Sequence, residues 1–172
     1  MDAGRRALLS PQRIALIRWL LATCLLVSIP IPGARAATLI ITDIEDIDLG
    51  EVLPTANGVR EQMRFCVNAT PAGPYQLTGV GSGPGGAFTL SNGSGPHGQI
   101  GYAVYVSDRG NQLRDQMTPN VPVGGLSARS PQANGNCMPP PVFLNVIIDS
   151  NDLARAPGGE YQGLLQLTVA PE

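Results

Sequence analysis

The stretch at residues 157–172 is the feature that most constrains the fold. It opens with Gly158-Gly159, a pair typical of turns, and its side chains then alternate between two faces. One face carries Tyr161, Gly163, Leu165, Leu167 and Val169, and the other carries Gln162, Gln166 and Thr168, interrupted only by Leu164. A period of two over residues 161–169 predicts a half-buried β-strand. Since this strand comes last, we expect no later segment to pair with it, and an apolar edge strand is prone to unwanted pairing unless something covers it.

Residues 1–36 predict a secretory signal peptide. Four arginines precede an apolar run at residues 19–31, which is too short to span a bilayer comfortably. Pro32-Gly33 ends this run, and Ala34-Arg35-Ala36 has the small-x-small form of a cleavage site. We therefore expect export through the inner membrane and cleavage after Ala36. The alternatives are an uncleaved anchor, a lipoprotein signal ending at Cys24, and a twin-arginine signal at Arg5-Arg6.

The expected mature chain, residues 37–172, is acidic and long enough for one domain with a core. It has six arginines and no lysine against twelve Asp and Glu, a formal charge of −6. This balance argues against nucleic acid as a partner, because phosphates attract basic surfaces. No transmembrane segment is expected after the leader.

Short apolar runs separated by turn residues predict an all-β sandwich or barrel. We expect seven to nine strands, with two short ones and a bend at residues 37–50. Further strands are expected at residues 63–67, 75–80, 87–91, 99–107 and 142–148, with a short edge strand at 112–117. Residues 118–141 are interpreted as a long polar loop and Leu153 as part of a linker. No segment beyond the leader shows a helical period.

Cys66 and Cys137 are the two cysteines that remain after the leader is removed. In an oxidising compartment they are expected to form a disulfide. Closing a loop of about 70 residues would stabilise the fold by roughly 4 kcal/mol on the chain-entropy model. The alternative, free thiols or a metal pair, lacks ligands, because the chain has one histidine and no CxxC motif.

No catalytic, cofactor or metal site is predicted. The acidic group Asp43, Glu45, Asp46 and Asp48 has calcium as an alternative, but each acid lies beside an isoleucine or leucine and the group has no central glycine, so a solvated strand face is preferred. His97 lies in a glycine-rich loop, and Ser94 and Asp108 are its only candidate partners for a triad. We interpret His97 as a loop residue and expect a protein that is not an enzyme.

Several segments together resemble the spore coat protein U-like pilins, subunits of archaic chaperone–usher pili. The segments are Asp48-Leu49-Gly50, Gly101-Tyr102-Ala103-Val104-Tyr105, and residues 142–172 with their V-x-L-x-V-x-I strand and the run APGGEYQGLLQLTV. The resemblance covers most of the mature chain. One departure is that the family places a cysteine before the turn that matches Leu49-Gly50, whereas Cys66 follows it.

The resemblance implies an immunoglobulin-like β-sandwich that lacks one strand and has a groove beside its last strand. Residues 45–172 would form this domain, and residues 37–44 would be an N-terminal extension that donates a strand to another subunit. The donor side chains would be Leu39, Ile41 and Ile44, and the acceptor groove would be bordered by Tyr161, Leu165, Leu167 and Val169.

The resemblance also implies partners and a destination. A periplasmic chaperone would fill the groove first, an outer-membrane usher would assemble the subunit, and neighbouring pilin subunits would follow at the cell surface. The alternative is a self-contained secreted β-sandwich that binds a ligand or inhibits a partner, in which residues 38–42 complete their own sheet.

Overall fold

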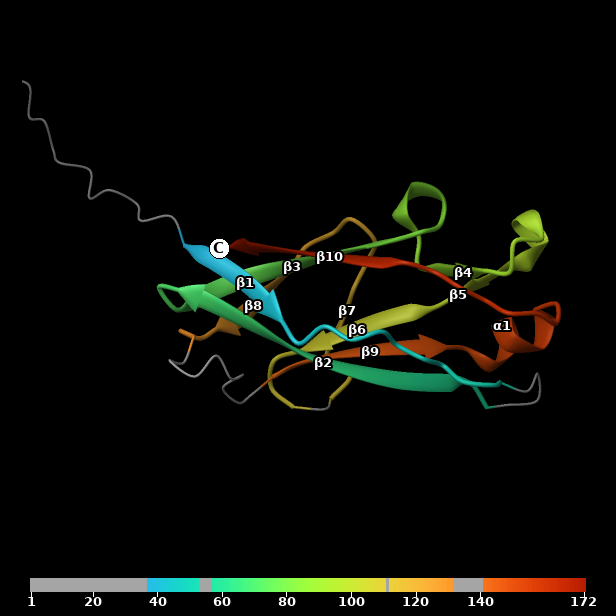
Figure 1. Cartoon of the computed structure of the whole chain (residues 1–172), viewed down its shortest axis with the longest axis horizontal. Helices are drawn as coiled ribbons and strands as arrows, with labels where there is room; N and C mark the ends of the chain where they lie inside the picture. The colour runs from blue at the N-terminus through green and yellow to red at the C-terminus, as the bar shows by residue number, and fades with distance from the viewer. Residues whose placement is uncertain (1–36, 53–56, 111, 132–140) are drawn as a thin grey trace, which may run out of the picture. The chain divides into compact units, whose positions relative to one another are not determined.

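Two antiparallel sheets pack face to face in the computed structural model of the protein (Figure 1), which describes residues 37–52, 57–110, 112–131 and 141–172. The described residues belong to one unit, Ala36–Glu172. The larger sheet has the strand order β1-β2-β9-β6-β7. Its strands are β1 (Thr38–Thr42), β2 (Val59–Thr70), β9 (Val142–Ile148), β6 (Ala103–Ser107) and β7 (Asp115–Gln116).

The smaller sheet has the order β10-β3-β8, and a two-stranded ribbon pairs β4 with β5. These strands are β10 (Leu165–Pro171), β3 (Gly73–Gly81), β8 (Val123–Ala128), β4 (Thr89–Ser91) and β5 (Gln99–Gly101). The helical segments are α1 (Ser150–Arg155) and two 3-10 turns, η2 (Pro84–Gly86) and η3 (Gly95–Gly98). No helix in the described ranges is both long and apolar enough to cross a membrane. The predicted all-β sandwich is confirmed.

Alternate side chains of both sheets meet in one hydrophobic core. Its fully buried members include Phe65, Tyr75, Leu77, Val104, Val106, Leu126 and Leu144. Each faces inward because successive strand residues point to opposite faces of a sheet. At about 25 cal/mol per Å² of apolar area removed from water, such side chains supply most of the stabilisation of a sandwich.

Several sequence-based expectations were wrong in detail, among them the two short strands expected at residues 37–50, where only β1 forms. Residues 123–128 lie in the expected loop yet form β8, whose Leu126 and Ala128 are buried against the core. Residues 99–107 form two strands, because Tyr102 leaves the ladder and stacks on Phe88 with ring centroids 5.7 Å apart. The expected linker contains α1, where the Asp149 side chain accepts a hydrogen bond from the Asn151 N–H and Leu153 is buried.

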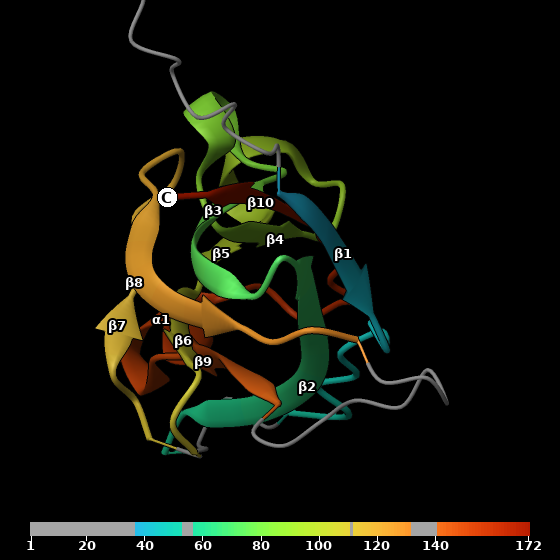
Figure 2. The same cartoon turned by 90° about the vertical axis from the view of Figure 1, so that its left-hand side faces the viewer.

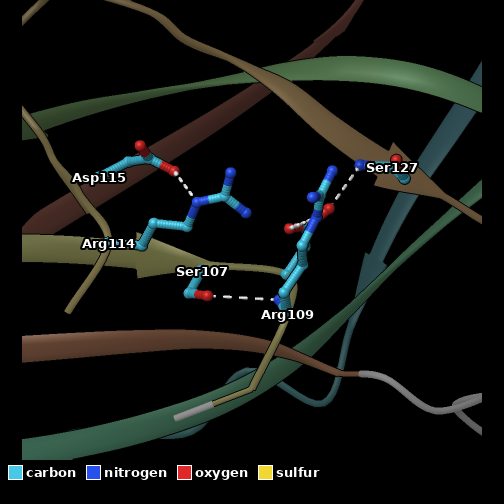
Figure 3. A network of polar contacts seen from close by, with 6 residues as sticks. Ser107, Arg109, Arg114, Asp115 and Ser127 are labelled. Carbon is cyan, nitrogen blue, oxygen red and sulfur yellow. Dashed lines mark hydrogen bonds and ion pairs between the residues drawn. The ribbon is translucent and has the colours of Figure 1, made fainter. Parts of the chain in front are cut away.

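One side of the sandwich is closed by hydrogen bonds between the sheets. The Ala69 N–H of β2 donates to the Arg129 carbonyl just after β8, at 2.8 Å. The Asp108 carboxylate at the end of β6 accepts from the Ser127 N–H of β8 at 3.0 Å and lies 3.7 Å from the Arg109 guanidinium (Figure 3). Figure 2 shows β8 on this side of the sandwich and β1 on the opposite side.

Tyr75 lies in the core and carries a buried hydroxyl group. Its ring is fully buried, and its hydroxyl has no hydrogen-bond partner among the described residues. Burial raises the pKa of Tyr75 above its ordinary value, and the nearby Asp108 carboxylate raises it further. The folded protein therefore favours the neutral phenol.

We predict that Tyr75→Phe stabilises the protein at pH 7 by about 1 kcal/mol, because it removes a buried, unsatisfied hydroxyl. In the unfolded chain the Tyr75 phenol has a pKa of about 10. Because the folded protein favours the neutral phenol, the stability that this preference contributes is fully present below that pKa and is lost as the pH rises above it. The substitution should therefore weaken the loss of stability between about pH 10 and pH 11. Urea unfolding at pH 7 and in this alkaline range measures both effects. A loss of stability at pH 7 would show that the hydroxyl has a partner.

Candidate functional site

An open groove of about 970 Å³ lies between residues 44–52, residues 156–165 and strands β2 and β9, and both apolar and polar side chains line it. Its floor is made by core side chains of β2 and β9, namely Met63, Leu144, Val146 and Ile148. Side chains near β4, β5 and α1 line one end, namely Leu90, Ile100, Tyr102 and Leu153. Burial raises the pKa of the Tyr102 hydroxyl, in keeping with this apolar setting.

Two extended segments form the walls of the groove. Residues 44–52 form one wall, and residues 161–165 with Leu167 form the other. Figure 1 shows residues 43–52 continuing from β1 toward α1, whereas β10 runs in the opposite direction. Residues 43–52 are not assigned to any strand, although Ile47 and Leu49 are half-buried and pack against the core.

The wall made by β10 has a free edge. Within the described part of the chain, β10 pairs only with β3, in a register from Leu165 opposite Gly81 to Pro171 opposite Tyr75. In an antiparallel strand, alternate residues direct their N–H and C=O groups toward each neighbour. Half of the main-chain groups of β10 therefore have no partner strand; this edge lies beside the groove at Leu165 and Leu167, and β1 approaches the strand further along.

The two ends of β10 have different neighbours. Leu165, Leu167 and Val169 face the core but are only half-buried, while Gln166 and Thr168 are exposed. β1 approaches β10, so Val169 shares the core with Leu39 and Ile41 of β1. Val169 does not line the groove, whereas Leu165 and Leu167 do.

Three of the four predicted acceptor residues thus line the groove: Tyr161, Leu165 and Leu167. Tyr161 also has a structural task, because its hydroxyl donates to the Pro157 carbonyl at 2.8 Å and accepts from the Asn92 amide at 3.3 Å. That these residues accept a strand stays a prediction.

The predicted donor residues occupy places within their own domain. β1 pairs antiparallel with β2, with Leu39 opposite Ala69 and Ile41 opposite Val67. Ile44 lines the groove wall and is 54% exposed. Residues 37–44 therefore lie against the domain that the sequence analysis separated from them, and a donor role would require β1 to leave β2. That role stays a prediction.

Sequence reasoning missed the floor of the groove and the wall at residues 45–52. The pattern of residues 142–148 predicts a buried strand, and Leu144 is indeed fully buried. A sequence pattern reports which side chains face inward, but it does not report which of them lie beneath an opening.

Among the described residues, the other candidates do not come together as a catalytic or metal-binding site. Cys66 is 4% exposed and disulfide-bonded, and Cys137 lies outside the described residues, so their pairing stays a prediction. His97 is exposed in η3, while Asp108 is buried and bonded to Ser127. The described residues contain no group of three or more His, Cys, Asp or Glu arranged to hold a metal ion.

We predict that Leu167→Ala costs about 1 kcal/mol of unfolding free energy, because one side of Leu167 already faces the open groove. Its matched control is Leu77→Ala on the neighbouring strand β3, where the side chain is fully buried; there we expect about 2–5 kcal/mol. Urea unfolding of both variants measures the difference. Equal costs would mean that the groove is closed over Leu167 in solution.

Comparison with known proteins supports the fold. No protein-family model matches the sequence, and no curated protein sequence matches it. Among solved structures, it resembles a chain from a study of the chaperone–tip adhesin complex of CFA/I fimbriae, with a TM-score of 0.54 and 15% sequence identity. The match covers 78% of this chain, which spans only 42% of the matched chain. At this identity the likeness shows a shared fold alone, an immunoglobulin-like β-sandwich.

Proposed function

We propose that this protein is a structural subunit of a bacterial surface pilus or coat, and that its groove takes up a β-strand from another chain. The observation that carries the proposal is the free edge of β10 above an apolar floor. A sandwich with a complete set of strands would cover both features.

A β-strand is the occupant whose chemistry fits this groove. An added strand offers main-chain donors and acceptors to the free edge of β10, and its alternate side chains fill apolar pockets below. Each apolar side chain buried on the floor would contribute roughly 1.5–3 kcal/mol. Ordering the backbone of the added segment costs about 1–2 kcal/mol per residue, so the buried side chains and the main-chain hydrogen bonds to β10 must act together.

We propose the partners that the resemblance to pilins implies. A periplasmic chaperone would fill the groove after export, an outer-membrane usher would receive the complex, and a neighbouring subunit would then replace the chaperone at the cell surface. The predicted leader and the fold shared with a chain from a chaperone–adhesin study support this sequence of partners. The function is structural, and we propose no catalytic role.

A second candidate function is a self-contained secreted β-sandwich that binds a ligand or inhibits a partner. The pairing of β1 with β2 within one chain favours it, because β1 then completes its own sheet. The two candidates differ in solution behaviour. A subunit with an unfilled groove self-associates or aggregates when it is purified alone, whereas a self-contained sandwich stays monomeric.

We predict that a strand appended after Glu172 through a flexible linker stabilises the protein. β10 ends at Pro171 and β1 approaches it, so the linker must pass β1 before an appended strand of alternating Val and Thr can lie along the free edge at Leu165 and Leu167. We expect a rise in Tm of at least about 5 °C and less aggregation, since about 1 kcal/mol shifts Tm by roughly 4 °C in a domain of this size. The matched control carries Ser in place of Val. A stable monomer whose Tm neither appended strand changes would contradict the proposal.

The donor role of residues 38–44 has a separate test. Under the donor prediction, deleting residues 37–43 leaves a folded domain, and a synthetic peptide of that sequence raises its Tm. Leu39→Asp with Ile41→Asp should likewise keep chaperone binding but prevent the subunit from joining another. Circular dichroism and thermal melts distinguish the outcomes. If the truncated domain is unfolded and the intact chain is a stable monomer, β1 is an ordinary internal strand and the donor prediction is wrong.

A further inference from the structure

The rims of the groove carry a single sign of charge. Five carboxylates are among the residues that line it: Glu45, Asp46, Asp48 and Glu51 on one rim, and Glu160 on the other. All five are exposed, and among the described lining residues none is Lys, Arg or His. The ion pairs Arg109–Asp108 and Arg114–Asp115 involve none of the five. The negative charge of the groove therefore belongs to the exposed segments that wall it, whereas Met63, Leu144, Val146 and Ile148 are apolar.

We propose that the occupant of this groove is a basic β-strand of a different protein, in which apolar residues alternate with Lys or Arg. This inference rests on the proposed function and adds the chemistry of the partner to it. In a strand, residues of one parity point down to the floor and residues of the other parity point outward. The inward residues would meet half-buried apolar side chains that line the groove, among them Leu49, Leu165 and Leu167, and the outward residues would lie between the two acidic rims.

Long basic side chains suit the rims for a second reason. Leu164 is 69% exposed and Ile44 is 54% exposed, and they stand on opposite walls of the groove. Lys and Arg cover apolar surface with their aliphatic stems while their charged ends stay in water. A strand with outward Lys or Arg would therefore cover both side chains and also meet the carboxylates.

A second copy of this chain does not supply such a strand from its N-terminal segment. Residues 37–44 (ATLIITDI) contain no basic residue. Placed in the groove of another copy with Leu39 and Ile41 directed inward, this segment would direct Asp43 inward as well and add a carboxylate beneath the acidic rims. Like charges at such close range disfavour a wrong partner. The charge of the rims therefore selects another protein over a second copy of this one.

Peptide binding tests the inference. Fluorescently labelled ten-residue peptides share four inward Val or Ile residues and differ only in their outward residues, which are Lys, Ser or Glu; a fourth peptide is residues 37–44. Affinities for the protein, purified with its natural N-terminus, are measured by anisotropy at 50 and 500 mM NaCl. We expect the Lys peptide to bind about tenfold more tightly than the Ser peptide at 50 mM, and the difference to shrink at 500 mM as salt screens exposed charges. The Glu peptide and residues 37–44 should bind more weakly than the Lys peptide.

Matched variants locate the effect on the rim. The rim variant Glu45→Gln, Asp46→Asn, Glu51→Gln keeps Asp48, which accepts from the Gly50 N–H at 2.9 Å. It should equalise the Lys and Ser peptides without changing the affinity of the Ser peptide. The control variant Glu61→Gln, Asp115→Asn, Asp152→Asn removes the same charge from residues that do not line the groove and should keep the preference.

Each outcome of the peptide experiment either supports or contradicts the inference. Equal affinity for the Lys and Ser peptides, a preference that survives in the rim variant, or tighter binding of residues 37–44 would overturn the inference while leaving strand uptake intact. A Lys peptide with Ser at its inward positions should not bind; if it does, the attraction is not specific to the groove and the inference is again wrong. If no peptide binds at all, the proposed function fails as well.

Discussion

The unpaired edge of β10 is the constraint on which the rest of the structure depends. Its main-chain groups on that edge have no strand partner among the described residues, and a groove lies beside Leu165 and Leu167. Exposed sheet edges are templates for pairing with other chains, and proteins cover or charge them to avoid this. Here the edge lies beside a groove with acidic rims, so what can pair with it is limited by the shape and charge of the groove.

The remainder of the sandwich holds this edge in place. Long pairings of β2 with β9 and of β10 with β3 form the two walls of the core. On the side away from the groove, the Ala69–Arg129 and Asp108–Ser127 hydrogen bonds join the sheets. Because these hydrogen bonds hold the two sheets together on that side, the sheets separate locally, at the groove. β1 covers only part of the open side, beside Val169, and leaves Leu165 and Leu167 to the groove.

Much of this fold could be predicted from the sequence, because period-two patterns report local burial. Residues 142–148 are β9 as expected, and the last strand was expected at residues 161–169 but spans Leu165–Pro171. The shift arises because Gln162 pairs with Ser91 instead of continuing the ladder with β3. β8 was missed because only Leu126 and Ala128 alternate clearly, after two exposed glycines. The groove exists because some strands of the two sheets do not contact one another across the sandwich. A local sequence pattern does not report such long-range contacts, so the groove could not be predicted from it.

Amide hydrogen exchange of β10 tests the central claim most directly. In the free protein, the account predicts that N–H groups directed toward β3 exchange slowly, whereas those directed toward the groove exchange rapidly. Saturation with the alternating Val/Lys peptide should protect this second set and leave the first set unchanged. If every amide of β10 is already protected in the free monomer, or if the bound peptide protects none of the second set, the edge of β10 is not where a strand is taken up.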